Sequence, residues 1–216
     1  MFHTLPDTSS PVKQAVILCH GYGSNGRDMA GLADTLAKDL PQTAWITPDA
    51  PRMVYPGGYE WFGMDTTDLT GTTHTELTTL TERARQTVPV LSDLIKQVQE
   101  TYHLPFNRIV VGGFSQGGLM ALLTALSLPQ PPAGVLCLSG VPYCPASVPV
   151  SVHPFPILMT HGTADPVVPP DQMIIGINQL RQIGLNPQLF KVAEMGHCLD
   201  ATCCREIILF LRKLFY

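Results

Sequence analysis

Short apolar runs alternate along this chain with longer segments in which apolar residues recur every three or four positions. The runs are rich in aliphatic and β-branched side chains, and most contain almost no polar residue, which is typical of strands covered on both faces. They lie at residues 15–19, 44–47, 108–111, 135–138, 157–160 and 188–192. This pattern predicts the strands of a mainly parallel sheet.

The longer segments have the spacing of helices with one apolar face. They lie at residues 28–39, 73–102, 116–126, 170–183 and 201–214. Pro89 should kink or divide the longest of them, because proline lacks an amide donor and clashes with the preceding turn. Alternating strands and helices predict an α/β fold with helices on both faces of the sheet. No repeat or linker divides the 216 residues, so we expect one domain over residues 1–216.

Composition excludes several classes of protein. Hydrophobic residues make up 45% of the chain and charged residues 14%, which is far from the composition of a disordered chain. The net charge is −4 and the lysines and arginines are scattered, so no nucleic-acid groove is expected. No segment approaches the roughly 20 apolar residues of a membrane span, and the first residues lack the pattern of a secretory signal. We therefore expect a cytoplasmic protein without an integral membrane segment.

Six cysteines raise the question of disulfides or a metal site. Cys19 and Cys137 lie inside apolar runs, where a free thiol packs as a small hydrophobic group. Cys198, Cys203 and Cys204 suggest zinc at first sight. However, adjacent residues on a helix point about 100° apart, and the paired spacing of structural zinc sites is absent. Reduced cysteines and no bound metal are the expectation.

The segment at residues 48–71 differs from the rest of the chain. It is long, rich in Pro, Gly and Asp, and contains several aromatic residues. Long ordered loops in compact domains are often functional. The segment either contributes to a site or is a surface excursion that its aromatic side chains anchor to the core, and the sequence favours neither interpretation.

The clearest chemical motif is Gly-x-Ser-x-Gly at residues 113–117, which follows an apolar strand and opens an apolar helix. This arrangement is typical of a nucleophile elbow, in which a sharp strand-to-helix turn exposes a serine hydroxyl. Glycines on both sides of Ser115 let the backbone close without Cβ clashes. A dinucleotide-binding loop fits less well, because Gly-x-Gly-x-x-Gly does not occur. Ser115 is therefore the candidate nucleophile.

A serine nucleophile needs a base, and the base needs a third group that orients it. After such an elbow the acid should come next in the chain and the histidine last. His197 lies in a loop after the last predicted strand and is the candidate base. Asp165 follows the strand at residues 157–160 and is the candidate acid.

Other residues near these positions have structural explanations. His161 precedes the candidate acid, so it does not fit the expected order, and we expect it to brace the acid loop. Asp171 and Asp200 are expected to cap helices. Glu194 is an alternative acid in a less favourable place.

A hydrolase of this design also needs two backbone N–H donors for the oxyanion. One is the amide of Gln116, the residue after the nucleophile, at a helix N-terminus. The other should come from a loop after an early strand, and the turn at residues 20–23 follows the first predicted strand. The Tyr22 amide is the candidate, and His20 is interpreted as a side chain that braces this loop rather than a catalytic one.

Together these motifs resemble those of the phospholipase/carboxylesterase family of α/β hydrolases, which includes the acyl-protein thioesterases. The resemblance covers nearly the whole chain, and its most specific part is Gly-Phe-Ser-Gln-Gly-Gly at residues 113–118. It is also carried by residues 19–23 with Asp28, residues 161–165 with Val168 and Pro169, Gly196 with His197, and Trp61 with Phe62. Two positions depart from the family pattern: Cys19 stands where leucine is usual, and Gly63 stands where aspartate is usual.

The resemblance implies an α/β-hydrolase fold without a large cap domain and hydrolysis of carboxylic esters or thioesters without a cofactor. Ser115 would form an acyl-enzyme, His197 would act as the base, and Asp165 would steady the imidazolium. The substrate would be a small-molecule ester, a lipid ester or an acylated protein. A lysophospholipase is the alternative enzyme. A non-catalytic binding module is the rival from another class, although no member of the triad is missing.

The resemblance also directs attention to the aromatic loop beside the site. Candidates for an apolar acyl-binding surface are Trp61, Phe62, Met64 and Leu69. Apolar residues around this loop could equally form the contact of a homodimer.

Overall fold

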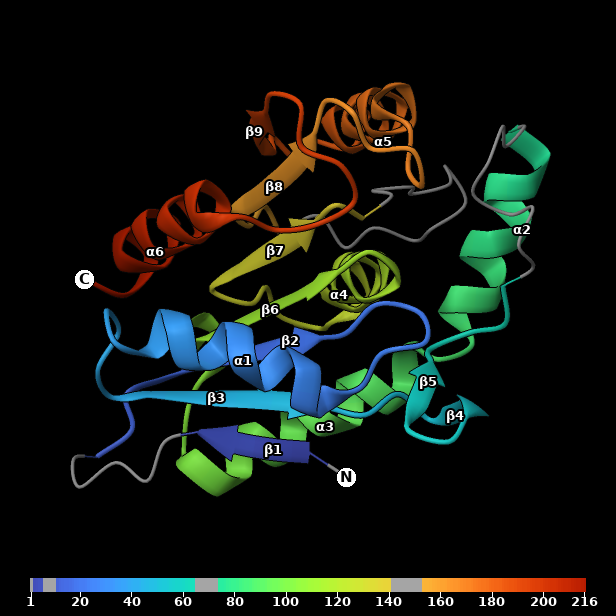
Figure 1. The fold of residues 1–216 in the computed structure, drawn as a ribbon. Helices are drawn as coiled ribbons and strands as arrows, with labels where there is room; N and C mark the ends of the chain where they lie inside the picture. The colour runs from blue at the N-terminus through green and yellow to red at the C-terminus, as the bar shows by residue number, and fades with distance from the viewer. Residues whose placement is uncertain (1, 6–10, 65–73, 141–152) are drawn as a thin grey trace.

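The computed structural model describes residues 2–5, 11–64, 74–140 and 153–216. Within these ranges the centre of the molecule is a seven-stranded sheet in the order β1-β3-β2-β6-β7-β8-β9 (Figure 1). The strands are β1 (Phe2–Leu5), β2 (Gln14–Cys19), β3 (Thr43–Pro48), β6 (Ile109–Phe114), β7 (Gly134–Leu138), β8 (Ile157–Gly162) and β9 (Gln188–Val192).

The six predicted strands are confirmed, and all six run parallel to their neighbours among them. β1 was not expected. It pairs antiparallel with the outer side of β3, with His3 opposite Thr47. Its four residues include two polar ones and form no apolar run, so periodicity alone could not identify it.

The helices also follow the predicted pattern. They are α1 (Gly26–Ala37), α2 (His74–Arg85), α3 (Val88–Tyr102), α4 (Gln116–Ser127), α5 (Pro170–Gln182) and α6 (Ala201–Phe215), with a short 3₁₀ turn, η1 (Phe106–Arg108). Pro89 divides the long helical segment as expected. It lies in the first turn of α3, where a missing amide donor costs nothing.

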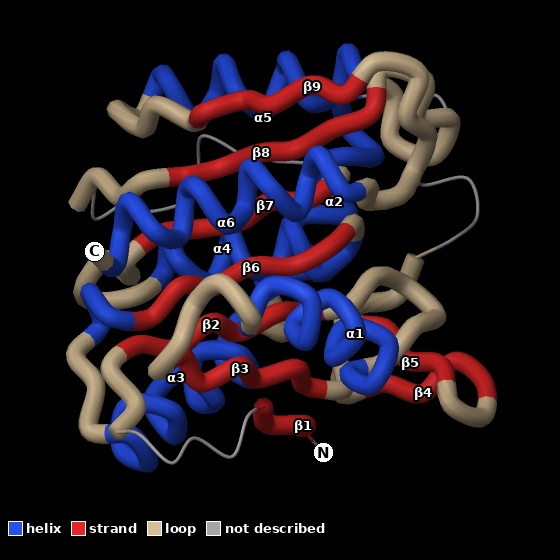
Figure 2. The backbone as a smooth tube through the Cα atoms, turned by 60° about the vertical axis from the view of Figure 1, so that its left-hand side comes forward, coloured by secondary structure: helices blue, strands red, loops and turns tan. Residues whose placement is uncertain are grey.

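The core consists of two layers, one on each face of the sheet. Alternate residues of β2 belong to different layers, because successive side chains of a strand point to opposite faces. α1 and α6 cover one face and α3, α4 and α5 cover the other (Figure 2). This arrangement confirms the α/β-hydrolase prediction. Among the described residues no helix has the length and apolar character needed to cross a membrane.

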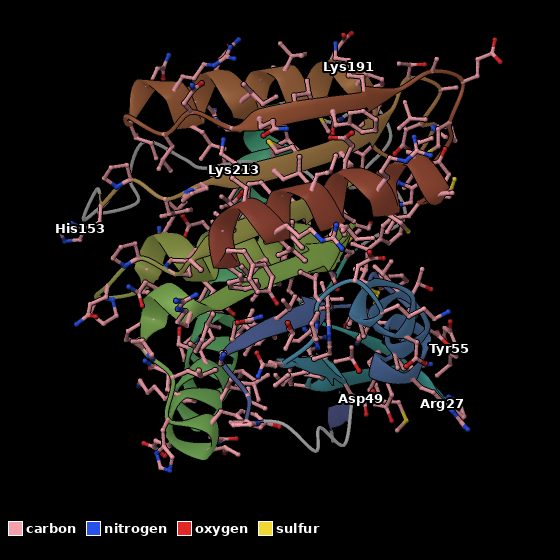
Figure 3. All side chains as sticks on the ribbon, turned by 90° about the vertical axis from the view of Figure 1, so that its left-hand side faces the viewer. Arg27, Asp49, Tyr55, His153, Lys191 and Lys213 are labelled. Atoms are coloured by element: carbon pink, nitrogen blue, oxygen red, sulfur yellow. The ribbon has the colours of Figure 1, made fainter. Side chains whose placement is uncertain are left out.

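Part of the segment at residues 48–71 forms a hairpin rather than a loop. β4 (Arg52–Tyr55) pairs antiparallel with β5 (Gly58–Glu60), and Gly57 takes a φ of +84° in the turn between them. Two backbone hydrogen bonds of 2.8 Å fasten β5 to the turn after β2, from Gly23 to Tyr59 and from Tyr59 to Ser24. In Figure 3, Tyr55 of β4 and Arg27 of α1 lie on the same side of the molecule. Residues 65–71 of this segment lie outside the described residues.

Two glycines on helices should respond to alanine in opposite ways. Gly31 lies on the exposed side of α1 with open space around it, so Gly31→Ala should raise the free energy of unfolding by about 0.5–1 kcal/mol. A methyl group at Gly117 would lie 2.3 Å from the carbonyl oxygen of Cys19, so Gly117→Ala should lower it by about 1–3 kcal/mol. Urea unfolding of both variants checks the pair. Equal effects would contradict the close backbone contact at Gly117.

Candidate active site

Ser115 lies in a strained turn between β6 and α4. Its φ of 53° and ψ of −116° are unusual for a residue with a side chain, and such a conformation costs on the order of 1–3 kcal/mol. The surrounding backbone holds it: the Ser115 amide donates to the Leu138 carbonyl at 2.8 Å. A methyl group at Gly113 would lie 2.5 Å from the backbone of Gly117, so only glycine permits the helix to start so close to the strand.

His197 and Asp165 are joined by a hydrogen bond of 2.8 Å between the imidazole Nδ1 and the carboxylate Oδ2. The carboxylate is buried, and its other oxygen accepts the amides of Val167 and Val168 at 2.9 Å each. Three donor nitrogens therefore hold the Asp165 carboxylate in one orientation. Since the carboxylate can only accept, Nδ1 carries the proton, which leaves Nε2 of His197 as the ring's basic atom.

The loop that carries His197 lies directly against the end of β8. A methyl group at Gly162 would lie 2.0 Å from the Met195 carbonyl oxygen, and the Ala164 amide donates to that same oxygen at 3.1 Å. The imidazole of His197 lies over Phe114, with 4.8 Å between the ring centroids. Because Phe114 immediately precedes Ser115, the candidate base and its acid lie close to the candidate nucleophile, at the carboxyl ends of β6, β8 and β9.

The competing residues have other partners. His161 is buried, and its Nε2 lies 2.8 Å from the Val168 carbonyl oxygen and 3.5 Å from Asp165. It braces the acid loop, in agreement with the structural interpretation. Asp200 caps α6 by accepting the Cys203 amide, and the hydrogen bonds it accepts lower the pKa of its carboxyl. Asp171 lies in the first turn of α5 and is not the cap that we expected, because Pro169 takes the N-cap position and no side chain caps the helix.

The turn after β2 lies beside the nucleophile. A methyl group at Gly21 would lie 3.4 Å from Cβ of Ser115. Within the described residues the Tyr22 amide has no hydrogen-bond partner, so it is available to an oxyanion. The Gln116 amide belongs to the first residue of α4, at the positive end of the helix dipole. Both candidate oxyanion donors are thus next to Ser115.

The side chain of Gln116 belongs to a buried polar network that the sequence did not reveal. The side chain of Gln116 accepts the Trp61 amide and donates to the Phe62 carbonyl, each at 2.8 Å. The Trp61 indole in turn donates to the His20 carbonyl at 2.9 Å. The signal that could have identified Gln116 is its position as the one long polar side chain in an otherwise apolar helix, where a buried amide needs partners.

An apolar pocket opens beside Ser115. Its described lining consists of Phe62, Met64, Leu80, Gln116, Leu119 and Val168. Phe62 and Met64 were predicted as acyl-binding residues and do line it. Trp61 is 1% exposed and is not part of this lining, and Leu69 lies outside the described residues. Leu80 and Leu119 have ordinary helix-core spacing, so the sequence did not distinguish them from core residues.

No cysteine side chain of the described residues is among the site groups named above. All five in the described ranges are free, and burial raises the pKa of the Cys137 thiol to about 12 and of the Cys203 thiol to about 11. Cys203 is buried whereas Cys198 is exposed. Over the ranges that the structure covers, no group of three or more His, Cys, Asp or Glu side chains is arranged to hold a metal ion.

The chain is similar to known esterases and thioesterases in sequence and in fold. The sequence model of the phospholipase/carboxylesterase family matches residues 5–215. Acyl-protein thioesterase 1 of Neurospora crassa is 31% identical over 211 residues, which cover 89% of this chain and 82% of that protein. The crystal structure of esterase PE8 has a TM-score of 0.88 and 30% identity, covering 98% of this chain and 97% of the esterase. Acyl-protein thioesterase 2 of Zea mays, at 23% identity and a TM-score of 0.76, shows the same fold over 100% of this chain and 99% of its own.

The sheet, the strained serine turn and the relatives define an esterase-type enzyme of the α/β-hydrolase class. Within that class the chain belongs to the phospholipase/carboxylesterase family, because the family match extends over nearly all of its residues.

The two buried histidines of this region should make the fold sensitive to acid. Burial lowers the pKa of both His20 and His161 below the ordinary value of 6.5, chiefly because the charged imidazole loses its hydration. The unfolded chain then binds protons more readily, so the free energy of unfolding should fall as the pH drops below about 6.5. The unfolding midpoints at pH 7.5 and 5.5 are compared to measure this fall in stability.

His161→Gln isolates the contribution of His161 to this loss of stability at low pH. Glutamine places an amide donor where Nε2 stood, toward the Val168 carbonyl, but it does not titrate. The midpoint of this variant should fall less on acidification than that of the wild type. An equal fall in both proteins would contradict the assignment of His161 as a neutral buried group.

Proposed function

We propose that this chain hydrolyses carboxylic esters or thioesters through an acyl-enzyme on Ser115. The observation that carries the proposal is the conjunction of the strained Ser115 turn with the His197–Asp165 hydrogen bond of 2.8 Å. Strain of this kind persists only where the surrounding structure enforces it, and it clusters at active sites. The family membership points to the same chemistry.

In the first half-reaction Ser115 Oγ attacks the acyl carbon while His197 Nε2 takes the hydroxyl proton. The carbonyl oxygen becomes an oxyanion, which the amides of Tyr22 and Gln116 bind. Asp165 stabilises the imidazolium through Nδ1. The intermediate then collapses, and the departing alkoxide or thiolate leaves with the proton from Nε2. The acyl group remains on Ser115.

In the second half-reaction water replaces the departed alcohol or thiol. His197 takes a proton from the water as it attacks the acyl carbon, and the same two amides bind the second oxyanion. Collapse releases the carboxylic acid and returns the proton to Ser115. No step needs a metal or an organic cofactor.

The apolar side chains next to Ser115 support the proposed substrate class. Phe62, Met64 and Leu119 line a small pocket there and would contact an acyl chain attached to Ser115. The relatives named acyl-protein thioesterases support acyl groups attached through sulfur, and the similar esterase supports acyl groups attached through oxygen. We therefore propose aliphatic acyl esters and thioesters, including acylated proteins, as the substrates.

Two further expectations stay proposals. The cysteines of the described residues are free, which supports location in a reducing compartment, and we propose the cytoplasm. Met53, Val54 and Tyr55 of β4 are exposed, and they are the candidates for a homodimer contact.

Ser115→Ala should abolish hydrolysis while leaving the fold intact, because the triad acts as a unit and its loss costs several orders of magnitude in kcat. The assay is release of p-nitrophenol from esters with C2 to C16 acyl chains, with a palmitoyl-thioester peptide and a lysophospholipid as further substrates. The acyl length with the highest kcat/KM shows which chain length the pocket accepts best. The last two substrates separate a thioesterase from a lysophospholipase. A folded Ser115→Ala variant with a tenth of the wild-type rate would sink the proposal.

The rate should also report the protonation of the base. kcat/KM is expected to rise with pH and then level off, because only neutral His197 accepts a proton from Ser115. The measurement is kcat/KM on a neutral short-chain ester, within the range in which the protein stays folded. A flat profile from pH 5 to 9 would argue against His197 as the base.

A further inference from the structure

The peptide bond between Gly21 and Tyr22 supplies one of the two proposed oxyanion donors. Its N–H must point at the reacting oxygen, and in a trans peptide the carbonyl points the opposite way. The orientation of the donor is therefore set by whatever holds the Gly21 carbonyl. Two groups do so: the His20 ring through Nδ1 at 2.7 Å, and the Ser24 amide at 3.2 Å.

The protonation state of His20 is determined by its surroundings. The Ala50 amide donates to Nε2 at 3.0 Å, so Nε2 carries no proton. In a neutral imidazole the proton then lies on Nδ1, which donates it to the Gly21 carbonyl. The ring is 0% exposed, and its burial lowers the pKa of His20, which keeps the ring neutral. The Ala50 amide then fixes which nitrogen carries the proton.

The position of the His20 backbone is held as firmly as its ring. The Trp61 indole donates to the His20 carbonyl at 2.9 Å, and the Gln116 side chain accepts the Trp61 amide at 2.8 Å. Gln116 also supplies the other proposed donor through its own amide. The two donors are consequently joined by one continuous chain of buried hydrogen bonds.

We infer that His20 is a positioning residue for hydrolysis: its Nδ1–H fixes the Gly21 carbonyl and thereby aims the Tyr22 N–H at the oxyanion. This inference rests on the proposed function. It assigns His20 no contact with the substrate and no proton transfer. Its effect is confined to steps in which negative charge develops on the acyl oxygen, so it acts on kcat rather than on the binding of the ground state.

Two substitutions separate the two hydrogen bonds of the ring. His20→Asn places an amide nitrogen near the position of Nδ1, so the Gly21 carbonyl keeps a donor while the Ala50 amide loses its acceptor. His20→Gln places an amide oxygen near the position of Nε2, so the Ala50 amide keeps its acceptor while the Gly21 carbonyl loses the ring donor and keeps only the Ser24 amide. Each variant is the matched control of the other, since both remove the imidazole from the same buried site.

The variants are compared by kcat and KM on the best p-nitrophenyl ester, by urea unfolding, and by affinity for an alkyl boronic acid that forms a tetrahedral adduct on Ser115. His20→Gln should lose about 10- to 100-fold in kcat with little change in KM, and it should lose affinity for the boronic acid by a similar factor. His20→Asn should retain kcat within a few-fold even if it is the less stable of the two.

The outcomes distinguish this inference from the proposed function. If His20→Asn loses as much kcat as His20→Gln, or if activity simply follows stability, His20 has only a structural role and the inference is wrong. If the wild type is inactive, or Ser115→Ala is as active as the wild type, the proposed function itself fails. A fall in kcat without a fall in affinity for the boronic acid would also overturn the inference.

Discussion

The contact between the end of β2 and the first turn of α4 is the constraint on which the site depends. Here the backbones of two elements approach so closely that a methyl group at Gly117 would lie 2.3 Å from the Cys19 carbonyl oxygen. This approach brings the turn at residues 20–23 beside Ser115. Because Gly117 has no side chain, the helix can start immediately after the strained serine. The nucleophile and the loop that faces it are therefore placed by the same backbone contact, before any side chain is considered.

Buried polar groups then hold the parts of this contact in register. Gln116, Trp61 and His20 all have hydrogen-bond partners. Gln116 joins the nucleophile turn to Trp61, Trp61 donates to the His20 carbonyl, and His20 accepts the Ala50 amide. A network of this kind is costly if any member lacks a partner, because a buried polar group cannot recover the hydrogen bond it had with water. Its completeness gives the site one arrangement rather than several. The apolar pocket lined by Phe62 and Met64 is attached to that same network through the Phe62 carbonyl.

Most of the sheet was predictable because its strands are covered on both faces and so form apolar runs with a clear beginning and end. β1 was not, since four residues at a sheet edge need no apolar run, and neither was the β4–β5 hairpin, whose first strand is exposed throughout. Within the site, Ser115, Asp165 and His197 lie where chain order and strand ends predicted. The side-chain role of Gln116 and the contacts of His20 with Ala50 and Trp61 depend on which backbone atoms come within 3 Å, and those contacts join residues 30 to 55 positions apart. Pattern along a chain carries no information on such pairs.

The loop after β9 has a consequence for how activity is lost. β9 is an edge strand that the structure leaves partly exposed, and it pairs on one side with β8. His197 reaches Asp165 only while this edge is in place, whereas Ser115 belongs to the buried centre of the sheet. Edge elements open at a lower free energy than the centre. A local detachment of the last strand and its loop would therefore silence the enzyme while most of the sheet stays folded, so that catalysis senses the integrity of the C-terminal edge rather than the stability of the whole molecule.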